Sequence, residues 1–122
     1  MASSSVKVGN YYKRKTKEWY EKQGYTVQLT EFTCSLAIKG RTIYRKIDIF
    51  GSDGIAMNGK ELIFWNSKAV TGSSNSIANE KSRAKVEFEK YPFPPDTILE
   101  AVIWKPKKKP QVFRFNNLTS LL

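Results

Sequence analysis

The sequence contains no histidine and only one cysteine, and each shortage excludes a class of chemistry. Without histidine, the chain cannot form a Ser-His-Asp triad, a Cys-His pair or a histidine-based metal finger. The single cysteine, Cys34, excludes an internal disulfide and lies in an alternating strand pattern that favours a small buried hydrophobic side chain. Any hydrolysis by this chain must therefore use carboxylates, lysine and a metal ion bound through oxygen atoms.

Long apolar segments are also missing. No apolar run approaches the roughly 20 residues of a membrane-spanning helix, and the first residues, Met1–Lys7, lack the apolar core of a signal peptide. We therefore expect an intracellular, cytoplasmic protein. A chain of 122 residues is long enough for one domain with an ordinary hydrophobic core. We place this domain at residues 10–122, after a short, polar and mobile segment at residues 1–9.

Acidic residues are scarce relative to basic ones. The chain has 21 Lys and Arg but only 11 Asp and Glu, and its formal net charge is +10 at pH 7. So large a charge on so short a chain attracts polyanions over a long range. Nucleic acid is the commonest biological polyanion, and an anionic membrane surface is the other one to consider.

The hydrophobic pattern predicts a mixture of helices and strands. Helical spacing of apolar residues indicates one helix over residues 10–23 and a second from Ser76 to Pro92. Strands are predicted at residues 25–30, 34–38, 43–49, 98–104 and 112–115, with a hairpin at residues 53–69. The order is a helix, three to four strands, a helix and two strands (α-β-β-β-β-α-β-β). It is typical of an α/β or α+β fold in which a mixed β-sheet is flanked by helices.

The hairpin carries the strongest local signals. Asn58-Gly59 lies between two apolar runs and predicts a tight type I′ turn, because both residues tolerate the positive φ that this turn requires. The run Leu62–Trp65 does not alternate, which is typical of a strand that is covered on both faces. We therefore predict that this strand lies in the middle of the sheet.

The same strand ends in three polar residues, Asn66, Ser67 and Lys68. Because side chains alternate along a strand, Asn66 and Lys68 share a face. Asp53 lies thirteen positions before Asn66, across the hairpin, close enough to converge on the same place. An acidic residue, an amide oxygen and a lysine in this arrangement suit phosphodiester chemistry. The oxygens hold a divalent cation, and the lysine supports the attacking water.

These residues resemble the core motif of the PD-(D/E)xK nucleases. The likeness rests on Asp53, the thirteen-residue spacing, the Gly59-Lys60 turn, the apolar strand and its Asn66–Lys68 ending. The segment Arg45–Asp53 is also similar to the segment before the metal-binding aspartate of VRR-type nucleases. The chain looks most like these nucleases and the archaeal Holliday-junction resolvases. The resemblance implies the restriction-endonuclease-like fold over residues 10–115.

The resemblance also implies a function. The chain would be a DNA endonuclease that depends on Mg²⁺ or Mn²⁺ and cuts branched, Holliday-junction-like DNA in recombination or repair. Asp53, Asn66 and the backbone carbonyl of Ser67 would bind the metal, and Lys68 would position the water and balance transition-state charge. A homodimer is predicted, because two strands of a junction must be cut. Neither a small-molecule cofactor nor a membrane is expected among the partners.

Two positions depart from the family pattern. Asn66 replaces the usual acidic residue and removes a negative charge that Mg²⁺ prefers. Lys13, eleven positions before Gly24, stands where such resolvases carry a helix glutamate, so Glu18 is the remaining candidate for that catalytic role. A second hypothesis is therefore a nuclease-fold domain that binds nucleic acid without cleaving it. A third, a small basic RNA-binding protein of ribosome-associated type, explains the charge but not the Asn66–Lys68 ending.

Basic residues gather on the outer faces of both predicted helices and in the last turn. They either form solvated faces or contact DNA phosphates without reading bases. The uncharged loop Thr71–Ser76 is likewise either a connector or a substrate contact. Asp48 is interpreted as an ion-pair partner of Arg45 or Lys46 rather than a metal ligand. The predicted DNA contacts are Lys13, Arg14, Lys15, Lys17, Arg45, Lys46, Lys81, Arg83, Lys85, Lys107, Lys108 and Lys109.

Overall fold

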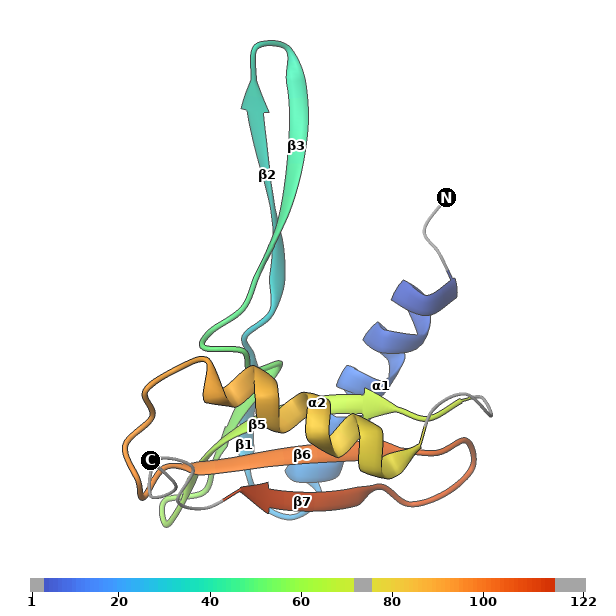
Figure 1. Cartoon of the computed structure of the whole chain (residues 1–122), viewed down its shortest axis with the longest axis vertical. Helices are drawn as coiled ribbons and strands as arrows, with labels where there is room; N and C mark the ends of the chain where they lie inside the picture. The colour runs from blue at the N-terminus through green and yellow to red at the C-terminus, as the bar shows by residue number, and fades with distance from the viewer. Residues whose placement is uncertain (1–3, 72–75, 116–122) are drawn as a thin grey trace.

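The computed structural model describes residues 4–71 and 76–115 of the 122-residue chain. These residues form a five-stranded sheet with a helix on each face, and a separate two-stranded sheet (Figure 1). In chain order the elements are α1 (Ser4–Glu21), β1 (Thr26–Leu29), β2 (Phe32–Ile38), β3 (Arg41–Ile47), β4 (Gly54–Met57), β5 (Leu62–Ala69), α2 (Ile77–Glu89), β6 (Ile98–Trp104) and β7 (Gln111–Phe115). The predicted mixed sheet flanked by helices is confirmed.

The five-stranded sheet has the order β1-β4-β5-β6-β7. Strands β5 and β6 run parallel, and the other neighbouring strands run antiparallel. A parallel pair needs a crossover connection, and α2 supplies it between β5 and β6. In Figure 1, α2 crosses the near face of the sheet and α1 lies behind it. We call this sheet, together with α1 and α2, the body.

The alternation of side chains along the central strands divides the core of the body into two layers. On the α1 side, Tyr20 packs with Trp65, and on the α2 side, Phe88 packs with Leu99. All four side chains are buried. Thr16 and Tyr20 lie four residues apart on the inward face of α1, and both are fully buried. Burial of these large side chains is the main source of stability for the body.

The two helices begin differently with respect to the prediction. α1 begins at Ser4 rather than at Asn10. Residues 4–9 contain no strong helix breaker, since Gly9 costs only about 1 kcal/mol relative to alanine. α2 begins as predicted, because the Ser76 side chain accepts a backbone N–H bond of the first turn at 3.1 Å. Neither helix of the described residues has the length and apolar character of a membrane-spanning segment.

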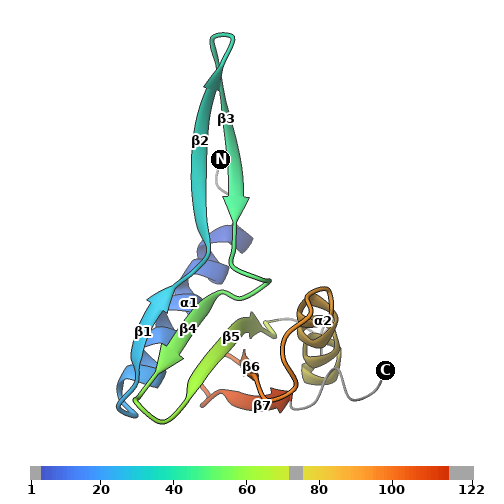
Figure 2. The same ribbon diagram turned by 90° about the vertical axis from the view of Figure 1, so that its left-hand side faces the viewer.

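The predicted run of successive strands implies that β2 and β3 belong to the main sheet, but in the structure they do not join it. They form a sheet of two strands that projects from the body (Figure 2), and we call this hairpin the arm. The place beside β1 is taken by β4 instead. Five strands separate the two helices along the chain, whereas the predicted order has three to four.

The type I′ geometry predicted for Asn58-Gly59 is absent there and occurs instead at the tip of the arm. At Asn58-Gly59, only Gly59 has a positive φ, of 86°. Asn58 instead accepts two backbone N–H bonds of the same loop with its side chain, which makes a wider loop than the predicted type I′ turn. At the tip of the arm, Lys39 and Gly40 have φ values of 50° and 76°, the signs that a type I′ turn requires.

Candidate functional site

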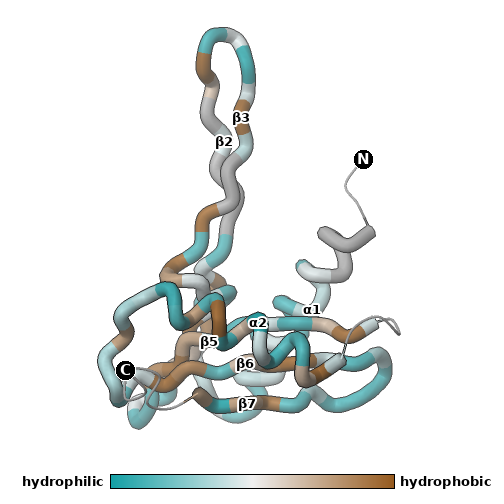
Figure 3. Tube along the Cα trace, viewed as in Figure 1, coloured by the Kyte–Doolittle hydropathy of each residue, from teal (hydrophilic) through white to brown (hydrophobic). Residues whose placement is uncertain are grey.

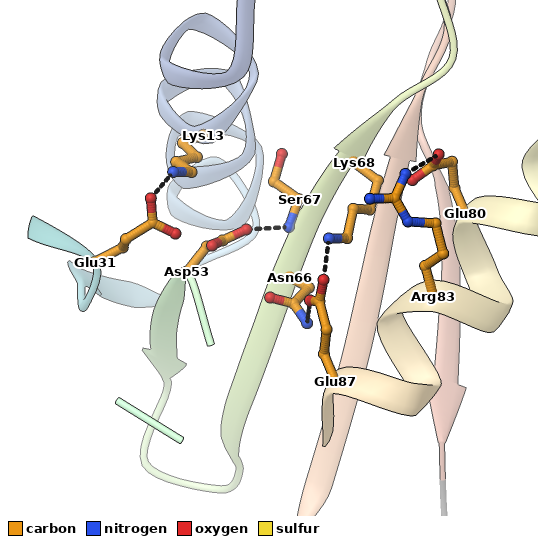
Figure 4. A network of polar contacts seen from close by, with 9 residues as sticks. All are labelled: Lys13, Glu31, Asp53, Asn66, Ser67, Lys68, Glu80, Arg83 and Glu87. Carbon is orange, nitrogen blue, oxygen red and sulfur yellow. Dashed lines mark hydrogen bonds and ion pairs between the residues drawn. The ribbon is translucent and has the colours of Figure 1, made fainter. Parts of the chain in front are cut away.

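The two strands of the central hairpin bring Asp53 to the polar end of β5. The backbone N–H of Asp53 donates to the carbonyl of Trp65 at 2.9 Å. Its Oδ2 accepts the backbone N–H of Ser67 at 2.8 Å (Figure 4). A Cβ atom at Gly54 would lie 2.1 Å from the Trp65 ring. Because Gly54 has no side chain, β4 can pass close beside Trp65. Asp53, the residue before Gly54, therefore lies next to β5.

A pocket of about 350 Å³ opens beside Asp53, and Lys68 also lines it. Four carboxylates face this pocket, so it is locally acidic on a protein whose net charge is +10. A larger hollow of about 670 Å³ is lined mainly by apolar side chains and shares only Tyr91 with the acidic pocket. The residues that line the acidic pocket are Glu31, Asp48, Gly51, Asp53, Lys68, Glu87, Lys90 and Tyr91.

A second carboxylate, Glu31, lies next to Asp53. Burial, followed by the hydrogen bond to Glu31, raises the pKa of Asp53 to about 7, while the Ser67 N–H and the charge of Lys13 act against this shift. Lys13 reaches over from α1 and pairs with Glu31 (Figure 4). Lys13 was predicted as a DNA contact, but in the structure its ammonium group supports the pair of carboxylates.

Glu87 of α2 binds both Asn66 and Lys68, which lie two positions apart on one face of β5. Its Oε1 accepts from Lys68 Nζ at 2.8 Å, and its Oε2 accepts from Asn66 Nδ2 at 3.2 Å. Asn66 is buried, so this bond satisfies an amide N–H that has lost water. Because its nitrogen is bound to Glu87, the amide turns its oxygen toward the Asp53 side of the site in Figure 4.

Ser67 lies between these two residues and points to the other face of the sheet. Its Oγ is 3.1 Å from Oγ1 of Thr16 on α1. Trp104 donates from Nε1 to the same Thr16 oxygen at 2.8 Å. These bonds attach the end of β5 to α1 and β6. The metal-binding role of the Ser67 carbonyl stays a prediction.

The structure does not bring Glu18 to Asp53. Glu18 is exposed and lines a different hollow, which it shares with the turn Lys107–Lys109. Its spacing along α1 explains this placement, because Glu18 lies two positions from the buried residues Thr16 and Tyr20. Residues two apart on a helix do not share a face.

Asp48 lines the pocket, and it has a structural partner as well. Its Oδ1 accepts the backbone N–H of Gly51 at 3.0 Å, which stabilises the turn between the arm and β4. The side chains of Arg45 and Lys46, its predicted ion-pair partners, lie outside the described part of the chain. Residues 72–75 of the loop predicted to contact substrate also lie outside it.

Five of the predicted DNA contacts on the helices are paired or stacked within the body. They are Lys17 with Glu21, Arg83 with Glu80, Lys85 with Glu89, Lys15 over the Trp104 ring and Lys81 over the Phe113 ring. The pairs Lys17–Glu21 and Lys85–Glu89 are exposed. Exposed ion pairs contribute only about 0–1 kcal/mol, so these two lysines can still exchange their partners for phosphates, whereas Arg83 pairs with a buried carboxylate. Arg14 and Lys107–Lys109 are exposed.

Two acidic residues of the site, Glu31 and Glu87, are missing from the predicted set. The sequence did contain a signal for Glu87, which lies three residues after Ala84 and seven after Glu80. This helical spacing places it on the same face as those two buried residues. Glu31 had no local signal, because it reaches Asp53 through the pairing of β1 with β4.

The oxygen atoms of the site can be tested against the metal ion that the resemblance implies. Within residues 4–71 and 76–115, no group of three or more histidine, cysteine, aspartate and glutamate side chains is placed to hold a metal ion. The pocket offers two neighbouring carboxylates, Asp53 and Glu31, whereas Asn66 is buried and does not line the pocket. Carboxylate oxygens suit Mg²⁺, which keeps several waters and completes its shell with substrate phosphates. A cation would also relieve the repulsion between the two carboxylates, so these donors fit a weakly held hard cation.

Comparison with known proteins gives a fold and no family. No protein-family model matches the sequence, and no curated protein matches it. Among solved structures, SSO0001 superposes with a TM-score of 0.54 and 13% sequence identity, over 94% of this chain and 53% of its own. This chain therefore spans about half the length of SSO0001. Hjc, a Holliday junction resolvase from Archaeoglobus fulgidus, has a TM-score of 0.46 and 13% identity, with 87% of this chain and 71% of Hjc covered.

Proposed function

We propose that this protein is a DNA endonuclease that uses Mg²⁺ or Mn²⁺ to cleave phosphodiester bonds of branched DNA. One observation carries the proposal: Asp53 and Lys68, at the ends of neighbouring strands, line one acidic pocket on a strongly basic protein. The basic surface attracts DNA, and the acidic pocket attracts the cation that a phosphate needs. The sequence resemblance to the PD-(D/E)xK nucleases supports the same chemistry and suggests branched DNA as the substrate.

Four of the residues that line the pocket have a part in the proposed reaction, and Asn66 and Ser67 of β5 join them. Asp53, Glu31 and the amide oxygen of Asn66 would hold the cation, with the Ser67 carbonyl as a further ligand. When bound, the cation would polarise the phosphate and lower the pKa of a water molecule. Lys68 donates hydrogen bonds to the attacking water or to a phosphate oxygen and balances the developing negative charge. Glu87 keeps the Lys68 ammonium group at the pocket, at 2.8 Å.

A homodimer is part of this proposal, because two strands of a junction must be cut. Light scattering on the full chain measures the mass in solution. We expect about twice the 14.0 kDa of one chain, at least when junction DNA is bound. A single-chain mass on the junction, with both strands still cut, would contradict the dimer.

Asn66 favours a second candidate function, in which the protein binds nucleic acid and does not cleave it. Its amide nitrogen is bound to Glu87, and an amide lacks the negative charge that a carboxylate gives a metal site. The ion therefore depends on Asp53 and Glu31 for its charge neutralisation. If their affinity for the cation is too low, the basic surface still binds DNA, but the pocket performs no chemistry.

A cleavage assay on junction, flap and linear DNA with Mg²⁺ or Mn²⁺ separates the two functions. We expect the wild-type protein to cut the junction. Lys68→Ala should slow the reaction by about 100-fold or more, as the loss of one group that stabilises developing charge commonly does. Lys60→Ala is the matched control, because it removes an exposed lysine at the β4–β5 loop, away from the pocket. It should retain cleavage.

The outcomes of this assay are distinct. A chelator should stop cleavage, and added Mn²⁺ should restore it. If Asn66→Asp cuts while the wild-type protein only binds, the nuclease site is silenced at that one residue. If neither cuts and both bind tightly, the second function is correct. Equal losses in Lys60→Ala and Lys68→Ala would contradict the role of Lys68.

A further inference from the structure

The body does not cover the side chains at the outer end of the arm. Every residue from Ala37 to Tyr44 is exposed, and the exposed fractions of Ile38, Ile43 and Tyr44 are 48%, 46% and 72%. Figures 1 and 2 both show the tip of the arm far from the sheet and its helices. Figure 3 shows hydrophobic and hydrophilic positions close together around this tip. A two-stranded hairpin is at best marginally stable alone in water, so this ribbon suits a partner that packs against it.

The charge of the arm has one sign. Residues 32–47 contain the basic residues Lys39, Arg41, Arg45 and Lys46 and no acidic residue. Lys39 and Arg41 lie at the tip and are exposed. A second copy of this chain carries a net charge of +10 and repels such a ribbon, whereas a polyanion attracts it. Charge therefore favours nucleic acid over another copy of the protein.

The arm is also rooted at the acidic pocket. Glu31 directly precedes β2, and Asp48 directly follows β3. Both residues line the pocket with Asp53 and Lys68. A nucleic acid that lies along the whole arm therefore reaches the proposed catalytic residues at its base.

The arm is a two-stranded β-ribbon that is long enough to reach across a groove of duplex DNA. The seven residues of β2 span roughly 23 Å, at about 3.3 Å per residue. The major groove is about 12 Å wide and about 8.5 Å deep, and it admits a two-stranded β-ribbon. We propose that the arm enters the major groove of duplex DNA next to the pocket, with Lys39 and Arg41 against the phosphates that border the groove. The inference rests on the proposed function for the identity of the polyanion and adds how the duplex is held.

Binding without metal tests this inference independently of cleavage. The protein is titrated into a short fluorescent duplex and into one of its single strands, in buffer with a chelator and at several salt concentrations. The test variant is Lys39→Gln with Arg41→Gln. We expect about tenfold weaker duplex binding and a salt dependence lower by about 2, because each phosphate contact contributes about 0.9 to the slope of log affinity against log salt. The loss should be smaller on the single strand, which has no groove.

The matched control is Lys22→Gln with Lys60→Gln, which removes the same charge from exposed positions outside the arm. In Figure 2, the β4–β5 loop that carries Lys60 lies at the opposite end of the body from the arm. Binding by this variant should change by less than about threefold. Equal losses in the two double variants would overturn the inference, as would an equal loss on duplex and single strand.

Two further results distinguish a failure of the arm inference from a failure of the proposed function. If no variant cleaves DNA but only the arm variant loses duplex binding, the nuclease proposal fails and the arm inference stands. If light scattering shows that the arm variant changes a dimer into a single chain, the arm binds a second copy of the protein, and the inference is wrong.

Discussion

The body and the arm both contain hydrophobic β-strands, but only the strands of the body are buried in a core. Ile63 and Trp65 of the body are fully buried, whereas Ile38 and Ile43 of the arm are exposed. The central strand β5 has a strand on each side and a helix over each face, while β2 and β3 form a sheet of two strands. Alternation therefore predicts a strand, and the elements layered on it decide whether it enters a core. The body positions the residues of the site, and the arm projects away from it.

The most damaging single change in the body should be Gly54→Ala. The added Cβ would lie 2.1 Å from the ring of Trp65, which is fully buried. We expect a loss of about 3 kcal/mol in the free energy of unfolding, at the upper end of the usual cost of overpacking. Urea unfolding followed by tryptophan fluorescence measures this loss. DNA cleavage should fall as well, because Asp53 directly precedes Gly54.

Gly9→Ala is the matched control for this prediction. Gly9 lies within α1, and a Cβ there would meet no atom within 4 Å. Alanine is favoured over glycine in a helix by about 1 kcal/mol, so this variant should be as stable as the wild-type protein or more stable. If Gly54→Ala also retained full stability, the close packing of β4 against Trp65 would not determine the position of Asp53.

The sequence predicted most elements of the body and the position of Asp53 beside β5, because both depend on local patterns. The apolar run before Asn66 identified the central strand, and the hairpin around Gly59 placed Asp53 beside it. The pairing of the strands confirms that arrangement. A strand and its hairpin partner are neighbours in sequence, so turn signals and alternation determine their relation directly.

The parts that the sequence did not predict depend on contacts between distant segments. Glu31 reaches Asp53 because β4, and not β2, pairs with β1. The arm forms for the same reason, since that pairing leaves β2 and β3 without a place in the main sheet. Periodicity cannot distinguish these two pairings, because each strand alternates in either case. The prediction of a type I′ turn at Asn58-Gly59 was also wrong. The Asn58 side chain accepts two backbone N–H bonds there and stabilises a different loop.

A smaller effect is expected from the pH dependence of the site. The pKa of Asp53 is raised from 3.8 to about 7 by burial and by Glu31. The folded state therefore binds this proton more tightly than the unfolded state, and the resulting stability is present below about pH 4 and lost as the pH rises through 7. Asp53→Asn resembles the protonated acid and removes this loss. Its Tm relative to the wild-type protein should rise between pH 5 and pH 8, by the equivalent of about 2–3 kcal/mol.

The absence of histidine makes this measurement clean, because no unperturbed side chain titrates between pH 5 and pH 8 in such a chain. Thermal unfolding is followed at several pH values in buffer with a chelator. Asp96→Asn is the control, because Asp96 is exposed in the segment just before β6, and this variant should follow the wild-type profile. A constant difference between Asp53→Asn and the wild-type protein at every pH would show that Asp53 is not perturbed by its surroundings.

The smallest effect should come from removing one hydroxyl group in each region. Tyr20 of the body is buried, and its hydroxyl donates to Glu100 Oε1 at 2.7 Å. Burial and the charge of Glu100 raise the pKa of Tyr20, so this hydroxyl remains a donor. Tyr20→Phe removes one bond from a buried carboxylate and should cost about 1–2 kcal/mol. Tyr44 of the arm is 72% exposed, so Tyr44→Phe should change stability by less than about 0.5 kcal/mol. Equal costs in urea unfolding would mean that the arm is packed in solution, and the contrast between arm and body would fail.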